Sequence, residues 1–264
     1  MGYENYELVS EWGNIYRSGG KAVKIYSADT PYEYAAKTAR IISMLCDAGL
    51  PVPAAYGAKK LDGGETALEM DYIDGKPFIY DGMSGGDREK ALAVMAELQC
   101  RINAVDAGGF GLPKFSDYLA EEIKETPYLS GQIKEKVFAL LARLDTGKTN
   151  LCHGDLHSHN ILYDGEKHWV IDWGGASAGD PAGDACMTYF YQKRSAQQLK
   201  EKFRKNFSFE EIYLRAYCEN SNVTRGEILA WLPVIAAYQV NINTKNERDF
   251  ILDIIYEWHE NPRV

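Results

Sequence analysis

The sequence of 264 residues contains no apolar run that approaches the roughly 20 residues needed to cross a bilayer. Its first ten residues, MGYENYELVS, have neither the basic segment nor the apolar segment that a secretion signal carries. We therefore expect a cytoplasmic protein that has no membrane partner.

Cysteine is scarce and shows no pattern. The chain has 5 cysteines, an odd number, with wide separations and no C-x-x-C pair. This spacing indicates neither a disulfide framework nor a zinc ribbon. We expect buried, reduced thiols at Cys46, Cys100, Cys152, Cys186 and Cys218.

Positive charge is in short supply, because 38 Asp and Glu residues outnumber 29 Lys and Arg residues and the net charge is -9. A nucleic-acid partner is disfavoured, since polyanion binding depends on clustered basic residues that release counterions. An acidic surface suits a cationic small molecule instead. With 45% hydrophobic and 25% charged residues, the composition is that of a folded globular protein.

The first part of the chain is predicted to form strands and one helix. Segments 14–18 and 21–26 alternate apolar and polar residues around Gly19 and Gly20, which suits a tight β-hairpin. A helix is predicted over 32–48, where apolar residues recur at helical spacing. This part of the chain therefore reads as an antiparallel sheet that carries one helix.

The boundary between two lobes is predicted near residue 74. A strand is expected over 65–73, and the sequence Asp74-Gly75-Lys76-Pro77 predicts a turn after it. We expect an α+β fold with two lobes: residues 1–74 form an antiparallel sheet with one helix, and residues 75–264 are mostly helical. Helices are predicted in the second lobe over 87–105, 132–144, 209–219, 225–240 and 247–258.

The most informative stretch runs from residue 152 to 186 and reads CHGDLHSHNILYDGEKHWVIDWGGASAGDPAGDAC. Asp155 is followed five residues later by Asn160, and two short strands then lead to Asp172. Phosphoryl transfer needs a carboxylate to accept the proton of the attacking hydroxyl and oxygen ligands for Mg²⁺. We therefore predict Asp155 as the catalytic base and Asn160 and Asp172 as magnesium ligands.

This stretch resembles the catalytic core of the aminoglycoside phosphotransferase and choline kinase family. The matching motifs are H-G-D-L-H-x-x-N-I-L, then V-I-D-W, then G-D-P-x-x-D. True protein kinases carry H-R-D and D-F-G instead, and an A-P-E motif that is missing here. The resemblance implies a two-lobed protein-kinase-like fold, in which the N-terminal lobe, 1–74, binds the nucleotide and the C-terminal lobe, 75–264, carries catalysis and substrate binding. It also implies a kinase that moves the γ-phosphate of ATP or GTP to a hydroxyl.

The same resemblance implies a set of nucleotide-binding residues. Lys24 is similar to the strand lysine that contacts the phosphates, and Glu33 is the helical acid that would pair with it. Gly13 lies in the turn expected to cover the phosphates, although that turn is poor in glycine. Main-chain groups of Asp71 and Ile73, in the expected hinge, would read the purine.

The acceptor is less well defined by the sequence. An aminoglycoside-like or other cationic molecule is expected, and choline, a sugar or an amino-alcohol metabolite is the alternative. Two acids of the G-D-P-x-x-D motif are expected to brace the catalytic loop and cap the next helix. The acidic residues that could hold a polyamine are Asp117, Glu121, Glu122, Asp180 and Asp184.

Two other interpretations stay open. His153, Asp155, His157 and His159 could be ligands of a two-metal hydrolase, but only His168 and His259 lie downstream, without partners at suitable spacing. That interpretation also leaves the spacing of Asn160 and Asp172 unexplained. A nucleotide-binding module that has lost catalysis is the other possibility. It is disfavoured because none of the expected catalytic residues is missing.

Overall fold

The computed structural model describes residues 6–10, 14–79, 83–203, 208–241 and 244–261. The chain forms two compact units, and each is described by itself below. The first unit comprises Met1–Tyr80 and Ser158–Gly174, and the second comprises Asp81–His157 and Gly175–Val264. The predicted division into 1–74 and 75–264 stays a prediction.

An antiparallel sheet of five strands forms most of the first unit, in the order β1-β2-β3-β5-β4. The predicted hairpin is present, with Gly19 and Gly20 at φ angles of 56° and 80°, which glycine adopts without a steric penalty. The strands are β1 (Glu7–Ser10), β2 (Ile15–Ser18), β3 (Lys21–Tyr26), β4 (Ala55–Lys60) and β5 (Thr66–Asp71).

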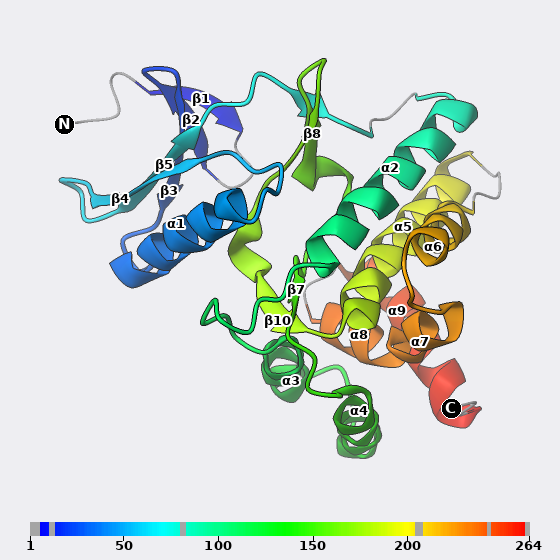
Figure 1. Cartoon of the computed structure of the whole chain (residues 1–264). Coiled ribbons are helices and arrows are strands. Elements are labelled where there is room, and N and C mark those ends of the chain that lie inside the picture. The colour runs from blue at the N-terminus through cyan, green and yellow to red at the C-terminus, as the bar shows by residue number, and fades with distance from the viewer. Residues whose placement is uncertain (1–5, 11–13, 80–82, 204–207, 242–243, 262–264) are drawn as a thin grey trace. The chain divides into compact units, whose positions relative to one another are not determined.

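Helix α1 (Tyr32–Asp47) is the one helix predicted for this part of the chain, and it packs against β4 and β5 (Figure 1). Its apolar stripe faces the sheet, and Ala35, Ala39, Ile42 and Leu45 are all buried there. The chain then turns at Gly49, whose φ is 75°. Apolar spacing at the helical period thus located this helix correctly.

A second, small sheet in the first unit contains β6 (Lys76–Pro77), β8 (Ile161–Tyr163) and β9 (His168–Val170). The turn predicted for residues 74–77 was therefore wrong at its last two positions, which pair with Tyr163 and Leu162. Proline is tolerated in β6 because this strand lies at the edge of the sheet. The main-chain N–H of Val170 donates to Pro51 at 2.8 Å, which ties β9 to the segment after α1.

In its described residues, the second unit is mostly helical and contains one two-stranded sheet. The single helix predicted over 225–240 was wrong, because it breaks at Trp231 and Pro233 occupies the first turn of α8, where its missing N–H costs no hydrogen bond. The elements are α2 (Gly85–Asn103), α3 (Phe115–Glu125), α4 (Gly131–Leu144), β7 (Asn150–Cys152), β10 (Ser177–Gly179), α5 (Pro181–Phe203), α6 (Phe209–Asn220), α7 (Arg225–Ala230), α8 (Leu232–Gln239) and α9 (Lys245–Glu260).

Helix α5 lies at the centre of the second unit. Residues 181–190 are all buried, and α5 packs against α6, α7 and α8. Within the described ranges, no helix is long and apolar enough to cross a membrane. The five cysteines are free thiols, of which Cys152 and Cys186 are buried and the other three are partly exposed.

Candidate active site

A buried carboxylate holds the backbone of the loop that follows β7. Asp184, in the first turn of α5, accepts hydrogen bonds from the main-chain N–H groups of His153 at 3.2 Å and Gly154 at 2.8 Å. It also accepts from the side-chain amides of Gln99 at 3.0 Å and Asn103 at 2.8 Å. Asp184 has no exposed surface, and these bonds confirm that it braces the loop.

Gly154 meets a steric requirement in this loop. Its φ is 76°, in the left-handed region that favours glycine. A Cβ at this position would lie 2.6 Å from the carbonyl oxygen of Gly175, closer than van der Waals contact allows. The loop can therefore approach residue 175 only because residue 154 has no side chain.

Asp155 presents a partly exposed carboxylate, with 40% of its side-chain surface accessible. Its Oδ1 accepts a hydrogen bond from the Tyr191 hydroxyl at 2.7 Å, and its Oδ2 lies 3.6 Å from Nε2 of His157. Burial acts to raise the pKa of Asp155, but hydrogen bonds from His157 and Tyr191 and the nearby histidines outweigh it and lower the pKa below its ordinary value. The carboxylate is therefore ionised at neutral pH, as a general base must be.

His153 supports the backbone of the loop. It is fully buried, and its Nδ1 accepts a hydrogen bond from the main-chain N–H of Asp155 at 3.2 Å. This bond fixes the backbone at the residue that carries the carboxylate. His157, whose role the sequence left open, lies beside that carboxylate instead.

Two residues that hold the loop were missed by the sequence analysis. The Thr188 hydroxyl donates to the carbonyl oxygen of Leu156 at 3.0 Å, and the Tyr191 hydroxyl donates to Asp155. Thr188 and Tyr191 follow Asp184 by four and seven residues on α5, so all three lie on one helix face. This spacing of hydrogen-bonding side chains was the signal that could have found them.

The other acid of the G-D-P-x-x-D motif also has a structural role. Asp180 accepts hydrogen bonds from the main-chain N–H of Ala182 at 2.9 Å, at the start of α5, and from Lys148 at 3.1 Å. Its side chain is only 8% exposed. Asp180 and Asp184 are therefore wrong as acceptor-binding acids, because both carboxylates are buried and already hydrogen-bonded.

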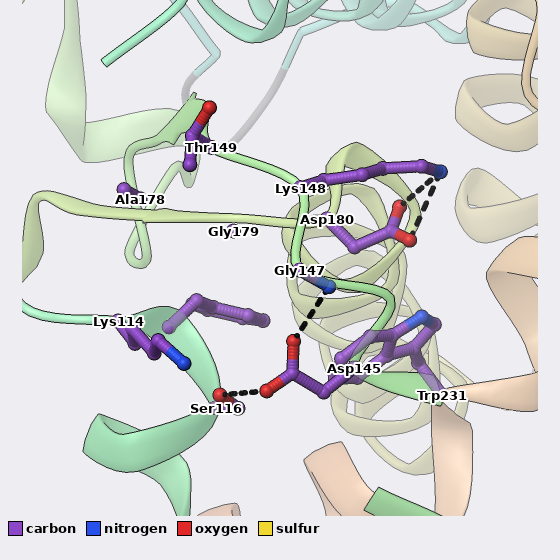
Figure 2. A pocket seen from close by; sticks show the side chains of 11 residues that line it. Lys114, Ser116, Asp145, Gly147, Lys148, Thr149, Ala178, Gly179, Asp180 and Trp231 are labelled. Carbon is purple, nitrogen blue, oxygen red and sulfur yellow. Dashed lines mark hydrogen bonds and ion pairs between the residues drawn. The ribbon is translucent and has the colours of Figure 1, made fainter. Parts of the chain in front are cut away.

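Figure 2 shows the pocket of about 110 Å³ beside Asp180, which the start of α3 and β10 help to line. Its acidic groups are already hydrogen-bonded. Lys148 reaches Asp180, while Asp145 accepts from the Ser116 hydroxyl at 2.8 Å and from the N–H of Gly147 at 3.1 Å. These internal pairs stabilise the connection into β7.

In the first unit, Asn160 and Asp172 lie at the same end of the hairpin formed by β8 and β9. Ile161 pairs with Val170, and the N–H of Ile171 donates to the carbonyl oxygen of Asn160 at 3.0 Å. Asp172 is the next residue, and its φ of 60° lies in the left-handed region, which is uncommon outside glycine but which aspartate adopts more readily than most residues. Asn160 is buried, whereas the side chain of Asp172 is 45% exposed.

Lys24 forms an ion pair with this aspartate. Its Nζ lies 2.8 Å from Oδ1 of Asp172, and its side chain is 19% exposed. Val23 and Ile25, its neighbours on β3, are buried together with Ala67. This alternation was predicted, and it leaves the ammonium group on the face of β3 opposite that cluster.

Helix α1 reaches the same segment through Tyr34. The Tyr34 hydroxyl lies 3.1 Å from the position that a Cβ on Gly174 would occupy, and its ring contacts Tyr26 edge to face at 5.5 Å. Glu33 is exposed in the first turn of α1, and the ion pair described for Lys24 goes to Asp172. The pairing of Glu33 with Lys24 stays a prediction.

Three further residues, Asp71, Ile73 and Gly13, were predicted to contact the nucleotide. The main-chain N–H of Asp71 donates to Ala54 at 2.9 Å, so this group is engaged within the protein. Ile73 follows β5, and its side chain packs near Gly75. Gly13 lies outside the described residues. The purine and phosphate roles of these three residues stay predictions.

Within the part of the chain that the structure describes, no three His, Cys, Asp or Glu side chains come together as a metal cluster. The metallohydrolase interpretation therefore finds no support in the geometry.

A comparison with family models identifies the relatives of this chain. The model of the phosphotransferase enzyme family, APH, matches residues 7–219. The chain belongs to this family. No curated protein sequence matches it.

Solved structures of other phosphotransferases share the fold. The aminoglycoside phosphotransferase APH(3'')-Id from Streptomyces rimosus, in complex with ADP and streptomycin, has a TM-score of 0.64 at 19% identity, over 90% of this chain and 93% of that one. The GDP complex of aminoglycoside 2'-phosphotransferase-IIIa has a TM-score of 0.63 at 15% identity, over 98% and 93%. A choline/ethanolamine kinase family protein from Mesorhizobium loti has a TM-score of 0.60 at 17% identity, over 100% and 90%. These matches confirm the predicted kinase-like α+β fold.

The donor set of this phosphotransferase suits magnesium. Mg²⁺ prefers hard oxygen ligands, takes only one or two carboxylates and keeps several waters. Asp172 offers an exposed carboxylate, and Asn160 lies beside it at the end of the hairpin. The residues present therefore fit the ion that the family resemblance implied.

Changing Lys24 of this phosphotransferase to methionine is expected to weaken the binding of ATP or GTP about tenfold, because the predicted charge-assisted contact to phosphate would be lost. Isothermal titration calorimetry with Mg²⁺ present measures the dissociation constants. Lys21→Met is the matched control on the same strand, because Lys21 pairs with Glu69 and not with Asp172. Equal nucleotide affinity in the Lys24 variant and the wild type would contradict the predicted role.

Proposed function

We propose that this protein is a small-molecule kinase that transfers the γ-phosphate of ATP or GTP to a hydroxyl group of a cationic acceptor. The observation that carries the proposal is the carboxylate of Asp155, which has a lowered pKa and is held in a braced loop. The sequence continues from this loop to Asn160 and Asp172 at the spacing found in the family. We expect the enzyme to act in the cytoplasm.

Asp155 is the proposed general base. Its carboxylate would orient the acceptor hydroxyl and accept its proton as the oxygen attacks the γ-phosphate. The transition state of such reactions is loose, so positioning and electrostatic stabilisation supply most of the acceleration. A base that is ionised and fixed before the acceptor binds suits this requirement.

The first unit is the part of the protein that we propose binds the nucleotide and its metal ion. Lys24 would bind phosphate oxygens, and Asn160 and Asp172 would hold Mg²⁺. When bound, the ion supplies positive charge that neutralises the phosphates. Main-chain groups at Asp71 and Ile73 would bind the purine.

An aminoglycoside-like molecule is the acceptor that we favour. One solved relative contains streptomycin, and Glu122 on α3 offers a carboxylate for an ammonium group, already accepting a hydrogen bond from Asn241 at 3.2 Å. Burial and the hydrogen bond with Tyr118 raise the pKa of Tyr238, and the charges of Asp155 and Glu122 add to this effect. The charges of Asp155 and Glu122 therefore both act on the hydroxyl group of Tyr238.

Choline, a sugar or an amino alcohol is the second candidate acceptor. It is favoured by the similarity to a choline/ethanolamine kinase family protein. A smaller acceptor would use the same base and the same magnesium ligands. The two candidates therefore differ in the acceptor contacts and not in the chemistry.

A thermal-shift panel of ATP, GTP and cationic metabolites with Mg²⁺ tests the proposal. Ligand at about 100 times its dissociation constant stabilises the folded state by about 2.7 kcal/mol, so a true nucleotide raises the melting temperature measurably. Pairs that stabilise the protein further are then assayed for ADP or GDP release, with EDTA as the control. If neither nucleotide shifts the melting temperature and none is hydrolysed, the protein is not a kinase.

A further inference from the structure

Tyr191 connects the proposed base to the interior of the second unit. Its hydroxyl lies 2.7 Å from Oδ1 of Asp155 and 3.1 Å from the side-chain nitrogen of Gln239. Tyr191 and Gln239 are buried, with 7% and 0% of their surface exposed. A hydrogen-bonded chain therefore runs from α8 through α5 to the base.

The direction of the protons in this chain follows from the chemistry of the groups. An ionised carboxylate can only accept, so the single proton of the Tyr191 hydroxyl must point at Asp155. The Gln239 amide nitrogen donates to the oxygen of Tyr191 and lies 3.2 Å from the sulfur of Met187, which is also only an acceptor. Gln239 thus occupies an acceptor site of Tyr191 and leaves its proton for the carboxylate.

We propose that Tyr191, oriented by Gln239, is a positioning residue that fixes the carboxylate of Asp155 for catalysis. This inference rests on the proposed function, because it assumes that Asp155 is the base. Tyr191 occupies one lone pair of Oδ1 and so restricts rotation of the carboxylate. The acceptor hydroxyl then meets a carboxylate that is already oriented, which lowers the entropic cost of reaching the transition state.

Other titratable groups lie near Asp155, and the effect of Tyr191 on its pKa must be distinguished from theirs. His153 and His157 lie on its own loop, Tyr191 comes from α5, and Tyr238 comes from α8, where the charge of Asp155 raises its pKa. The two histidines and Tyr191 all favour the ionised carboxylate. Removal of the Tyr191 hydroxyl alone therefore isolates its contribution.

The first measurement is independent of activity. The pKa of Asp155 is obtained from the pH titration of its side-chain carboxyl ¹³C signal, which is assigned by its absence in Asp155→Asn. Tyr191→Phe is expected to raise this pKa by about one unit, because a hydrogen bond to a charged group is lost. Gln239→Leu should raise the pKa of Asp155 less, because Tyr191 still donates to the carboxylate but no longer accepts a hydrogen bond from Gln239.

Tyr189→Phe is the matched control. Tyr189 lies on the same helix, is buried to a similar extent and is not among the residues that contact Asp155. Its replacement should leave the pKa of Asp155 unchanged, and melting temperatures should show that all the variants fold. A Tyr191→Phe protein that folds and keeps the wild-type pKa at Asp155 overturns the proposal.

The second measurement concerns turnover. Hydrolysis of ATP and GTP without an acceptor is followed with Mg²⁺ present, and Tyr191→Phe is expected to lower kcat about tenfold with the nucleotide KM unchanged. A rise in KM at constant kcat, or wild-type kinetics, would contradict positioning. Absence of both nucleotide binding and hydrolysis in the wild type would instead count against the kinase itself, while the titration still decides whether Tyr191 controls Asp155.

Discussion

Replacing Asp155 with asparagine is expected to lower kcat by about a thousandfold while the nucleotide dissociation constant stays near that of the wild type. Asparagine keeps the shape of the side chain but cannot accept a proton from the acceptor. The variant should still bind ATP or GTP, because the residues proposed for the nucleotide are unchanged. A coupled assay of nucleoside diphosphate release and a calorimetric titration measure the two quantities.

Asp145→Asn is the control for this experiment. Asp145 is an aspartate of the same unit that accepts hydrogen bonds from Ser116 and Gly147, and the mechanism assigns it no role. The kcat of the Asp145→Asn variant should equal that of the wild type. Loss of nucleotide binding together with turnover in Asp155→Asn would show that this residue does not act as the base.

The pH dependence of the same reaction follows from the lowered pKa of Asp155. A base works only when it is ionised, so a lowered pKa keeps it active at pH values below those at which an ordinary carboxylate would be protonated. The acidic limb of the kcat/KM profile, which reports the free enzyme, should therefore lie below the usual carboxylate range.

Changing Asp184 to asparagine is expected to reduce the free energy of unfolding by about 3 kcal/mol, the second large effect. The buried carboxylate of Asp184 accepts four hydrogen bonds. In the asparagine variant, the NH₂ group would replace one of the two accepting oxygens and would face the groups that now donate to it. Each buried donor that is left without a partner costs roughly 1–3 kcal/mol, and the carbonyl oxygen of the asparagine, which can still accept, offsets part of this loss. Chemical denaturation measures the difference.

An exposed aspartate provides the comparison for this stability measurement. Asp106 accepts from the N–H of Gly108 and from the hydroxyl of Thr149, but it lies in solvent. Asp106→Asn should therefore destabilise the protein much less. Equal losses in the two variants would mean that burial of Asp184 does not matter.

The sequence predicted best those elements whose apolar residues line one face. Helix α1 was located from such a stripe. Helix α5 was expected only from the motif that precedes it, and apolar spacing gave no bounds for it, because residues 181–190 are buried on every side and show no alternation of apolar and polar positions. Helix α3 carries Phe115, Leu119 and Ile123 at helical spacing, all buried, and that signal was overlooked.

The candidate site was predictable where a motif covered it and not elsewhere. Asp155, Asn160 and Asp172 were chosen from their joint spacing, and their roles stay predictions. The contact of Lys24 with Asp172 joins residues far apart in the chain, so no local pattern could indicate it. Tyr191 was missed because its role depends on which face of α5 meets the loop, and that face is set by tertiary packing.

The close approach of Gly154 to Gly175 has a consequence for protein engineering. Any side chain at residue 154 would push two backbones apart next to the proposed base, so a library aimed at new acceptors should keep this position fixed. Diversity is better introduced at Glu122 and Asn241, whose side chains contact each other on α3 and just beyond α8. Changes there could alter acceptor choice without moving the loop that performs the chemistry.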